Sequence, residues 1–155
     1  MSEVNTATRA AGSSPASRLA RVRMASFGAV TMLIIEFILG MIYNLYGTAP
    51  TASKSIGLFS SPVLALHVIM SILLLVAAVI LLVRAIGARH RLTIWMSALG
   101  LAAIVAAGFA GLAFTGNGAA GASLGMSLAF AVSLACYVVI ILAVSPASAA
   151  SPSTT

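Results

Sequence analysis

Four long runs of apolar residues limit what this chain can fold into. They cover residues 24–46, 61–84, 94–115 and 124–145. A helix of about 20 apolar residues crosses the hydrocarbon core of a bilayer. Only 6% of the residues are charged, compared with roughly a quarter in soluble domains, so the chain has too little polar surface to be soluble. The sequence therefore predicts an all-α integral membrane four-helix bundle with up-down-up-down connections.

Polar segments flank this transmembrane domain, which we place at residues 24–145. Residues 1–23 are rich in Ser, Ala, Thr and Arg, and residues 146–155 contain only Pro, Ser, Thr and Ala. Such segments bury too little apolar surface to offset the entropy lost on ordering. We predict two disordered cytoplasmic tails. A cleaved signal peptide is the alternative at the N-terminus, but its apolar core would be only about 7 to 15 residues long.

Basic residues indicate how the helices are oriented. Seven of the eight Lys and Arg residues precede the first run or lie between the second and third: Arg9, Arg18, Arg21, Arg23, Arg84, Arg89 and Arg91. Cytoplasmic loops carry an excess of Lys and Arg, so we expect a multi-pass plasma (inner) membrane protein with both termini in the cytoplasm. The net charge of +6 therefore does not indicate nucleic-acid binding, because the chain has no basic stripe with interleaved aromatics.

Glu36 is the residue that most strongly suggests a site. It lies near the middle of the first run, where a carboxylate costs at least a few kcal/mol unless it is protonated, paired or hydrated. Helical steps of three and four place Gly40, Tyr43, Asn44 and Gly47 on the same face. A lipid-facing stripe would carry fewer polar and small residues, so we expect this face to point into the bundle.

His67 enters the membrane from the same side as Tyr43 and Tyr46, the aromatic residues expected at the outer interface. At 1.5 Å per residue it lies roughly 8 Å deep and Glu36 roughly 15 Å deep, so the two side chains can meet. Ser71 extends the His67 face by one turn. We predict a polar site formed by Glu36, Tyr43, Asn44, His67 and Ser71.

This polar site has two interpretations. Glu36 and His67 could simply hydrogen-bond between helices, which is worth about 1 kcal/mol in membranes. Alternatively, they could line an outward-opening pocket for a proton, a haem, a quinone or a small ligand, because ionisable groups inside membranes usually mark functional sites.

The remaining candidates are isolated residues. Cys136 lies in an apolar run and is expected to pack as a small apolar residue. Small residues at Gly100, Gly108 and Gly111 are expected to let a neighbouring backbone approach closely. His90 lies between two arginines, where it would meet solvent or lipid headgroups. The chain has no Ser/His/Asp set, paired carboxylates, nucleotide-binding loop or HExxH motif, so we predict no catalytic or metal-binding residues.

The segment Glu36-Phe37-Ile38-Leu39-Gly40, followed by Asn44-Leu45-Tyr46-Gly47 and then by His67 in the next helix, resembles one four-helix half of the haem A synthase family over about 35 residues. In that family an acid or amide precedes a Leu-Gly pair, and a histidine near the outer end of the next helix ligates haem. The resemblance implies haem as a candidate cofactor on His67. The family pattern places a second histidine in the fourth helix, where this chain has none, so Met126, water or His67 of another subunit would supply the second ligand.

We therefore predict a small, non-enzymatic membrane protein with an outward-opening interior polar site, accessory to respiratory or membrane-complex assembly. The first alternative is a haem-binding protein resembling half of a haem A synthase. The second is an oligomeric transporter or channel component in which Glu36 is a proton or cation site. The expected partners are the lipid bilayer and either further copies of the chain or a larger membrane complex.

Overall fold

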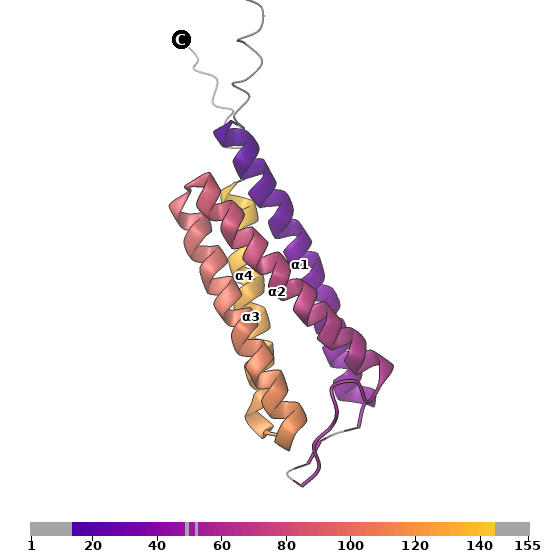
Figure 1. Ribbon diagram of the computed structural model, residues 1–155. Coiled ribbons are helices and arrows are strands. Elements are labelled where there is room, and N and C mark those ends of the chain that lie inside the picture. The colour runs from indigo at the N-terminus through magenta and orange to yellow at the C-terminus, as the bar shows by residue number, and fades with distance from the viewer. Residues whose placement is uncertain (1–13, 49, 52, 145–155) are drawn as a thin grey trace, which may run out of the picture.

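The computed structural model of the protein describes residues 14–48, 50–51 and 53–144. This part of the chain forms four helices: α1 (Pro15–Tyr46), α2 (Pro62–Ala88), α3 (Arg91–Asn117) and α4 (Ala120–Ala143). Figure 1 shows two antiparallel hairpins, α1–α2 and α3–α4, side by side. Contacts between α2 and α3 and between α1 and α4 join the hairpins. All four helices are long and apolar enough to cross a membrane, which confirms the predicted fold.

Two helices begin with the same local signal. The side chains of Ser14 and Ser61 cap the backbone N–H groups of Ser17 and Leu64, each at 3.2 Å. A proline follows each cap at the first helical position, where its missing N–H removes no hydrogen bond. The start of α2 agrees with the predicted boundary at residue 61.

The start of α1 is a correction to the prediction. Residues 15–23 are helical, although a disordered tail was expected as far as residue 23. The Ser14–Pro15 signal starts the helix early, and Val22 gives the extension a fully buried position in the core. The rest of this predicted tail, residues 1–13, and the predicted C-terminal tail, residues 146–155, lie outside the described residues.

The α2–α3 and α3–α4 connections are shorter than the apolar runs suggested. Helix α2 continues to Ala88, so the predicted loop at 84–93 is reduced to Arg89 and His90. At the opposite end, α3 ends at Asn117 and is capped by Gly118, which has a φ of 66°. A Cβ at Gly118 would lie 2.8 Å from the Pro50 carbonyl oxygen, so both the turn and the loop that packs on it favour glycine.

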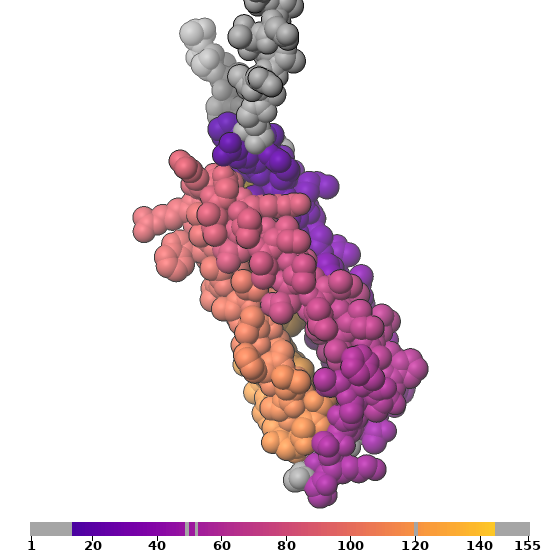
Figure 2. All heavy atoms as spheres, viewed as in Figure 1, coloured from indigo at the N-terminus to yellow at the C-terminus, as the bar shows by residue number. Residues whose placement is uncertain are grey.

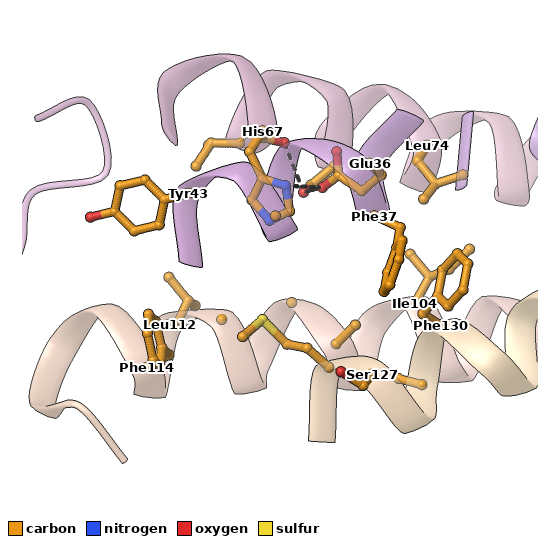
Figure 3. Close-up of a pocket in the computed structure, with 18 of the residues that line it drawn as sticks. Glu36, Phe37, Tyr43, His67, Leu74, Ile104, Leu112, Phe114, Ser127 and Phe130 are labelled. Atoms are coloured by element: carbon orange, nitrogen blue, oxygen red, sulfur yellow. Dashed lines mark hydrogen bonds and ion pairs between the residues drawn. The ribbon is translucent and has the colours of Figure 1, made fainter. Parts of the chain in front are cut away.

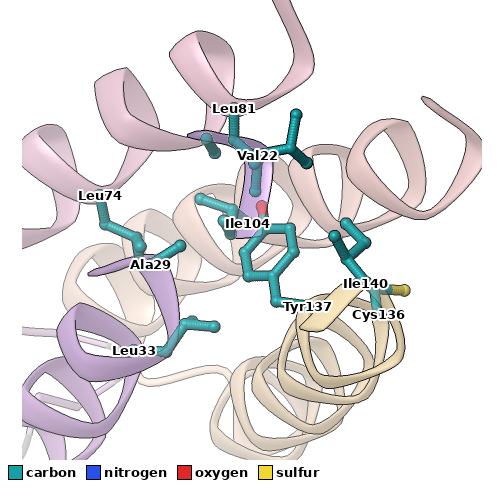
Figure 4. Close-up of a cluster of buried hydrophobic side chains, with 10 residues drawn as sticks. Val22, Ala29, Leu33, Leu74, Leu81, Ile104, Cys136, Tyr137 and Ile140 are labelled. Atoms are coloured by element: carbon teal, nitrogen blue, oxygen red, sulfur yellow. The ribbon is translucent and has the colours of Figure 1, made fainter. Parts of the chain in front are cut away.

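The buried core extends from the middle of the bundle toward one end, and Figure 4 shows how its side chains meet. All four helices contribute to it, with Val22, Ala29, Leu33, Leu74, Leu81, Ile104, Cys136, Tyr137 and Ile140 among its members. We call this end, which also carries Arg84, Arg89 and Arg91, the basic end. The opposite end carries the α1–α2 connection and Gly118, and we call it the loop end.

Gly100 allows α3 and α4 to approach closely within this core. A Cβ at Gly100 would lie 2.5 Å from Cε1 of Tyr137, and Ser133 donates a hydrogen bond to the Gly100 carbonyl oxygen at 3.2 Å. The predicted role of small residues is therefore confirmed at Gly100. It is wrong at Gly108, where a Cβ would meet nothing within 4 Å, and Gly111 is only in ordinary contact with the Met126 sulfur. These two glycines lie farther along α3, where the hairpins separate.

Large apolar side chains cover the outside of the helices. Trp95 is 63% exposed and Leu142 is 67% exposed. In water such a surface would be unfavourable, whereas lipid tails solvate it at no cost. The exposed surface therefore agrees with a multi-pass membrane protein, and the cavity inside the bundle is the feature that needs a separate explanation.

Candidate functional site

The two hairpins diverge toward the loop end and enclose a cavity of about 480 Å³. Figure 2 shows the hollow between α2 and α3. Residues of all four helices line the cavity, together with Leu58 from the α1–α2 connection. This volume lies within the range of about 300 to 1,000 Å³ that is usual for small-molecule sites. The cavity is therefore large enough to hold a ligand.

Glu36, His67 and Ser71 form a polar cluster in the wall that α1 and α2 provide (Figure 3). Oε1 of Glu36 lies 3.2 Å from Nδ1 of His67 and accepts a hydrogen bond from the Ser71 hydroxyl. Ser71 Oγ also lies 2.9 Å from the His67 carbonyl oxygen. Because a serine hydroxyl has one proton, it donates to one of these oxygens at a time or accepts from a protonated carboxyl group.

The cluster does not use all of its hydrogen-bonding capacity. The contact between His67 Nδ1 and Glu36 Oε1 is within ion-pair distance but is not aligned as a hydrogen bond, and Glu36 Oε2 is buried without a partner among the described residues. A buried acceptor without a donor costs about 1 to 3 kcal/mol. The cluster can therefore accept a further donor, from water or from a ligand.

The position of the imidazole depends on Gly40. A Cβ at Gly40 would lie 3.2 Å from Cε1 of His67, closer than most carbon contacts in proteins. The Gly40 site, one turn after Glu36, thus leaves room for the ring against α1. Figure 3 shows the ring extending from α2 into the cavity, with Nδ1 beside Glu36. Nε2 is the nitrogen left for another partner.

The opposite wall of the cavity is mainly apolar. The rings of Phe37 and Phe130 stack with centroids 4.6 Å apart and close the cavity at the end away from Tyr43, as Figure 3 shows. Met126 and Ser127 of α4 also line this space. A ligand in the cavity would therefore contact apolar surface everywhere except at the polar cluster and a few hydroxyl and amide groups.

The structure brings the predicted site residues to one cavity but gives them different contacts. Glu36, Tyr43, Asn44, His67, Ser71 and Met126 all line it. Asn44 was expected close to Glu36, but Ser71 contacts the carboxyl group instead. Tyr43 was expected at the outer interface. It is only 9% exposed, and its hydroxyl group donates to the Thr48 carbonyl oxygen at 3.2 Å.

Sequence reasoning did not identify the part that the α1–α2 connection plays. The Ile56 N–H donates to the Thr115 carbonyl oxygen at 2.9 Å, which ties the connection to the end of α3. Leu58 follows and lines the cavity. Nothing in the sequence of this segment marks either contact, because both depend on how the second hairpin packs against the first.

Comparison with protein-family models, with curated proteins and with solved structures finds no match to this chain. Within the described residues, no group of three or more His, Cys, Asp or Glu side chains is placed to hold a metal ion.

Proposed function

We propose that the protein is a non-enzymatic membrane protein that binds an amphiphilic small molecule in the cavity between its hairpins. The observation that carries this proposal is the position of the Glu36–His67–Ser71 cluster in the wall of an otherwise apolar cavity. The polar head of the ligand would lie at the cluster, and its apolar body along Phe37, Phe130 and the facing helices.

The chemistry of the cluster defines the head group. Glu36 Oε2 offers an unused acceptor, and the imidazole offers a ring nitrogen beyond the one that faces Glu36. A hydroxyl group can donate to Glu36 Oε2, and it can accept from His67 Nε2 in the tautomer that carries the proton on Nε2. A long-chain alcohol or a quinol has such a head on an apolar body, and either would reach the cavity from the bilayer through the hollow between α2 and α3.

The proposed orientation places the basic end in the cytoplasm, since cytoplasmic loops are rich in Lys and Arg. The cavity then lies in the outer half of the membrane. We assign the protein an accessory role in a respiratory or other membrane complex. Binding rather than turnover is the activity to be measured.

Thermal unfolding of the purified protein in detergent tests the proposal, with 1-decanol and a short-tailed quinol as probes. Decane, which lacks a hydroxyl group, is the control. We expect either hydroxyl compound to raise the melting temperature more than decane. Glu36→Gln and His67→Ala should remove the difference. Equal effects of 1-decanol, the quinol and decane, or unchanged differences in both variants, would contradict a role for the cluster.

A matched pair of glycine variants tests the cavity itself. Gly108 lines the cavity, and a Cβ there meets nothing within 4 Å, so Gly108→Leu should fill the space without straining the backbone. Gly28 is equally unhindered but lies outside the cavity, so Gly28→Leu is the control. Only Gly108→Leu should abolish the effect of the probes.

A second candidate ligand is haem, and one contact favours it. Ligating histidines commonly have a carboxylate at the ring nitrogen that does not bind the metal, and Glu36 occupies that position beside His67 Nδ1. His67 and Met126 line the same cavity and would hold the iron, which would supply electron-transfer or oxygen chemistry. The absorption spectrum of protein purified from haem-supplemented cells distinguishes this ligand. A Soret band that is lost in His67→Ala would support haem as the ligand. If the parent protein shows no Soret band, haem is excluded.

A further inference from the structure

A second cavity, of about 290 Å³, lies at the basic end, and its lining is almost entirely arginine. Arg18 and Arg21 of α1 and Arg84 and Gly87 of α2 surround it. The two α1 arginines are one helical turn apart, so both reach the same side of the helix. Three cationic side chains from two helices thus converge on one space.

Backbone contacts hold two of these arginines in place. Arg18 Nη1 donates to the Gly87 carbonyl oxygen at 3.3 Å, which fixes its guanidinium group against the last turn of α2. Arg21 Nε donates to the Ser17 carbonyl oxygen at 3.4 Å. A guanidinium group has five N–H donors, so the Arg21 contact leaves donors of that side chain for another acceptor. The arginine side chains are therefore already placed to surround a group that is rich in hydrogen-bond acceptors.

The charge at this end is not balanced by the described part of the chain. The sequence contains two acidic residues, and Glu36 is the one that lies within the described residues. Glu36 follows Arg21 by about 15 residues in α1, which is roughly 22 Å along the helix axis. Among the described residues, neither Arg21 nor Arg84 pairs with a carboxylate. The mutual repulsion of the arginines favours binding of an external anion.

We propose that Arg18, Arg21 and Arg84 form a binding site for a phosphate group at the membrane surface. Arginine pairs with phosphate oxygens through two parallel hydrogen bonds, and basic pockets between transmembrane helices recognise anionic headgroups. The site lies where the apolar spans of α1 and α2 end, the depth at which the phosphates of a bilayer lie. The phosphate is that of an anionic phospholipid or of a soluble phosphate compound, two sources with one recognition chemistry.

Native mass spectrometry of the full chain in detergent tests the site, with phosphatidylglycerol, phosphatidylcholine and inorganic phosphate as separate probes. We expect phosphatidylglycerol to bind more tightly than phosphatidylcholine. Arg21→Gln and Arg84→Gln should each weaken this binding by about fivefold, since one basic residue contributes about that factor at a membrane surface. Arg91→Gln removes the same charge from the same end outside the cavity, and should leave binding unchanged.

The outcomes separate a site from diffuse attraction and identify the source of the phosphate. Binding of inorganic phosphate that is lost in Arg84→Gln and kept in Arg91→Gln supports a site for soluble phosphate. The same pattern with phosphatidylglycerol alone supports a headgroup site. The proposal is overturned if Arg91→Gln weakens binding as much as Arg84→Gln, or if neither phosphate probe binds more tightly than phosphatidylcholine. The circular dichroism spectrum of each variant confirms that it is folded.

Discussion

The imidazole ring of His67 packs against the backbone of α1 at Gly40, and a Cβ at this glycine would lie 3.2 Å from Cε1 of the ring. This contact joins two features that are 27 residues apart in the sequence. It holds the ring close to Glu36, which lies one turn before Gly40. The geometry of the polar cluster therefore depends on the absence of a side chain at Gly40.

Gly40→Ala should displace the His67 ring by a few tenths of an ångström and weaken its contact with Glu36. Nitrogen NMR of histidine-labelled protein in detergent would detect this as a shift of the His67 ring signals, which His90→Gln helps to assign. Gly28→Ala is the control, since a Cβ at Gly28 meets nothing within 4 Å. If the two glycine variants give the same His67 signals, the contact does not position the ring.

Gly100→Ala should destabilise the bundle by about 1 to 3 kcal/mol, the usual cost of adding volume to a packed core. The new Cβ would lie 2.5 Å from Cε1 of Tyr137, so the α3–α4 pair must separate or Tyr137 must move. Unfolding in increasing fractions of sodium dodecyl sulfate measures the loss. Gly108→Ala is the control, since it adds a Cβ to the same helix at a position where nothing lies within 4 Å. The unfolding midpoint of this variant should equal that of the parent.

A double-mutant cycle measures the interaction between Glu36 and His67. Glu36→Gln keeps the volume but replaces one carboxyl oxygen with an amide nitrogen, and it should leave the fold intact, while His67→Ala should cost about 1 kcal/mol. We expect a coupling free energy of about 0.6 kcal/mol, and no more than about 1.7 kcal/mol, from the four unfolding midpoints, since these are the average and the maximum for polar pairs within membranes. A coupling of zero would mean that the two residues are neighbours without an energetic interaction.

Reporter fusions test the proposed orientation. A reporter after Gly57 should be located outside the cell. A reporter after Arg89 should be in the cytoplasm, because Arg84, Arg89 and Arg91 lie close to this fusion point in the sequence. Labelling of single cysteines at the same positions, in Cys136→Ser protein, gives an independent measurement. Cytoplasmic accessibility at Gly57 would reverse the orientation of both cavities.

Apolar runs and cap residues were sufficient to predict the fold. Each predicted span lies largely within an observed helix, and Ser61–Pro62 correctly identified the start of α2. The predicted start of α1 was wrong because Arg18, Arg21 and Arg23 reduce the local hydropathy of a segment that is nevertheless helical. Only the tertiary structure shows that Val22, in the middle of these arginines, is fully buried.

The polar site was predicted in part. Glu36, His67 and Ser71 could be grouped from helical periodicity and depth alone, since both helices enter the membrane from the same side. The divergence of the two hairpins could not be predicted, because hydropathy does not report the angle between helices. Gly100 and Gly108 look alike in the sequence, yet only the first is in close contact with a neighbouring helix.

Because the bundle is packed at one end and open at the other, a small tilt of a helix at the packed end produces a larger displacement at the open end. Tyr137 and Ser123 of α4 are 14 residues apart, so tilting the helix by about 1° around Tyr137 moves Ser123 by roughly 0.4 Å. The hydrogen bond between Ile56 and Thr115 links the two hairpins at the open end and limits how far they can separate. The packing of Tyr137 against Gly100 therefore sets the width of a cavity that Tyr137 does not line, and substitutions at Gly100 should alter which ligand sizes the cavity accepts.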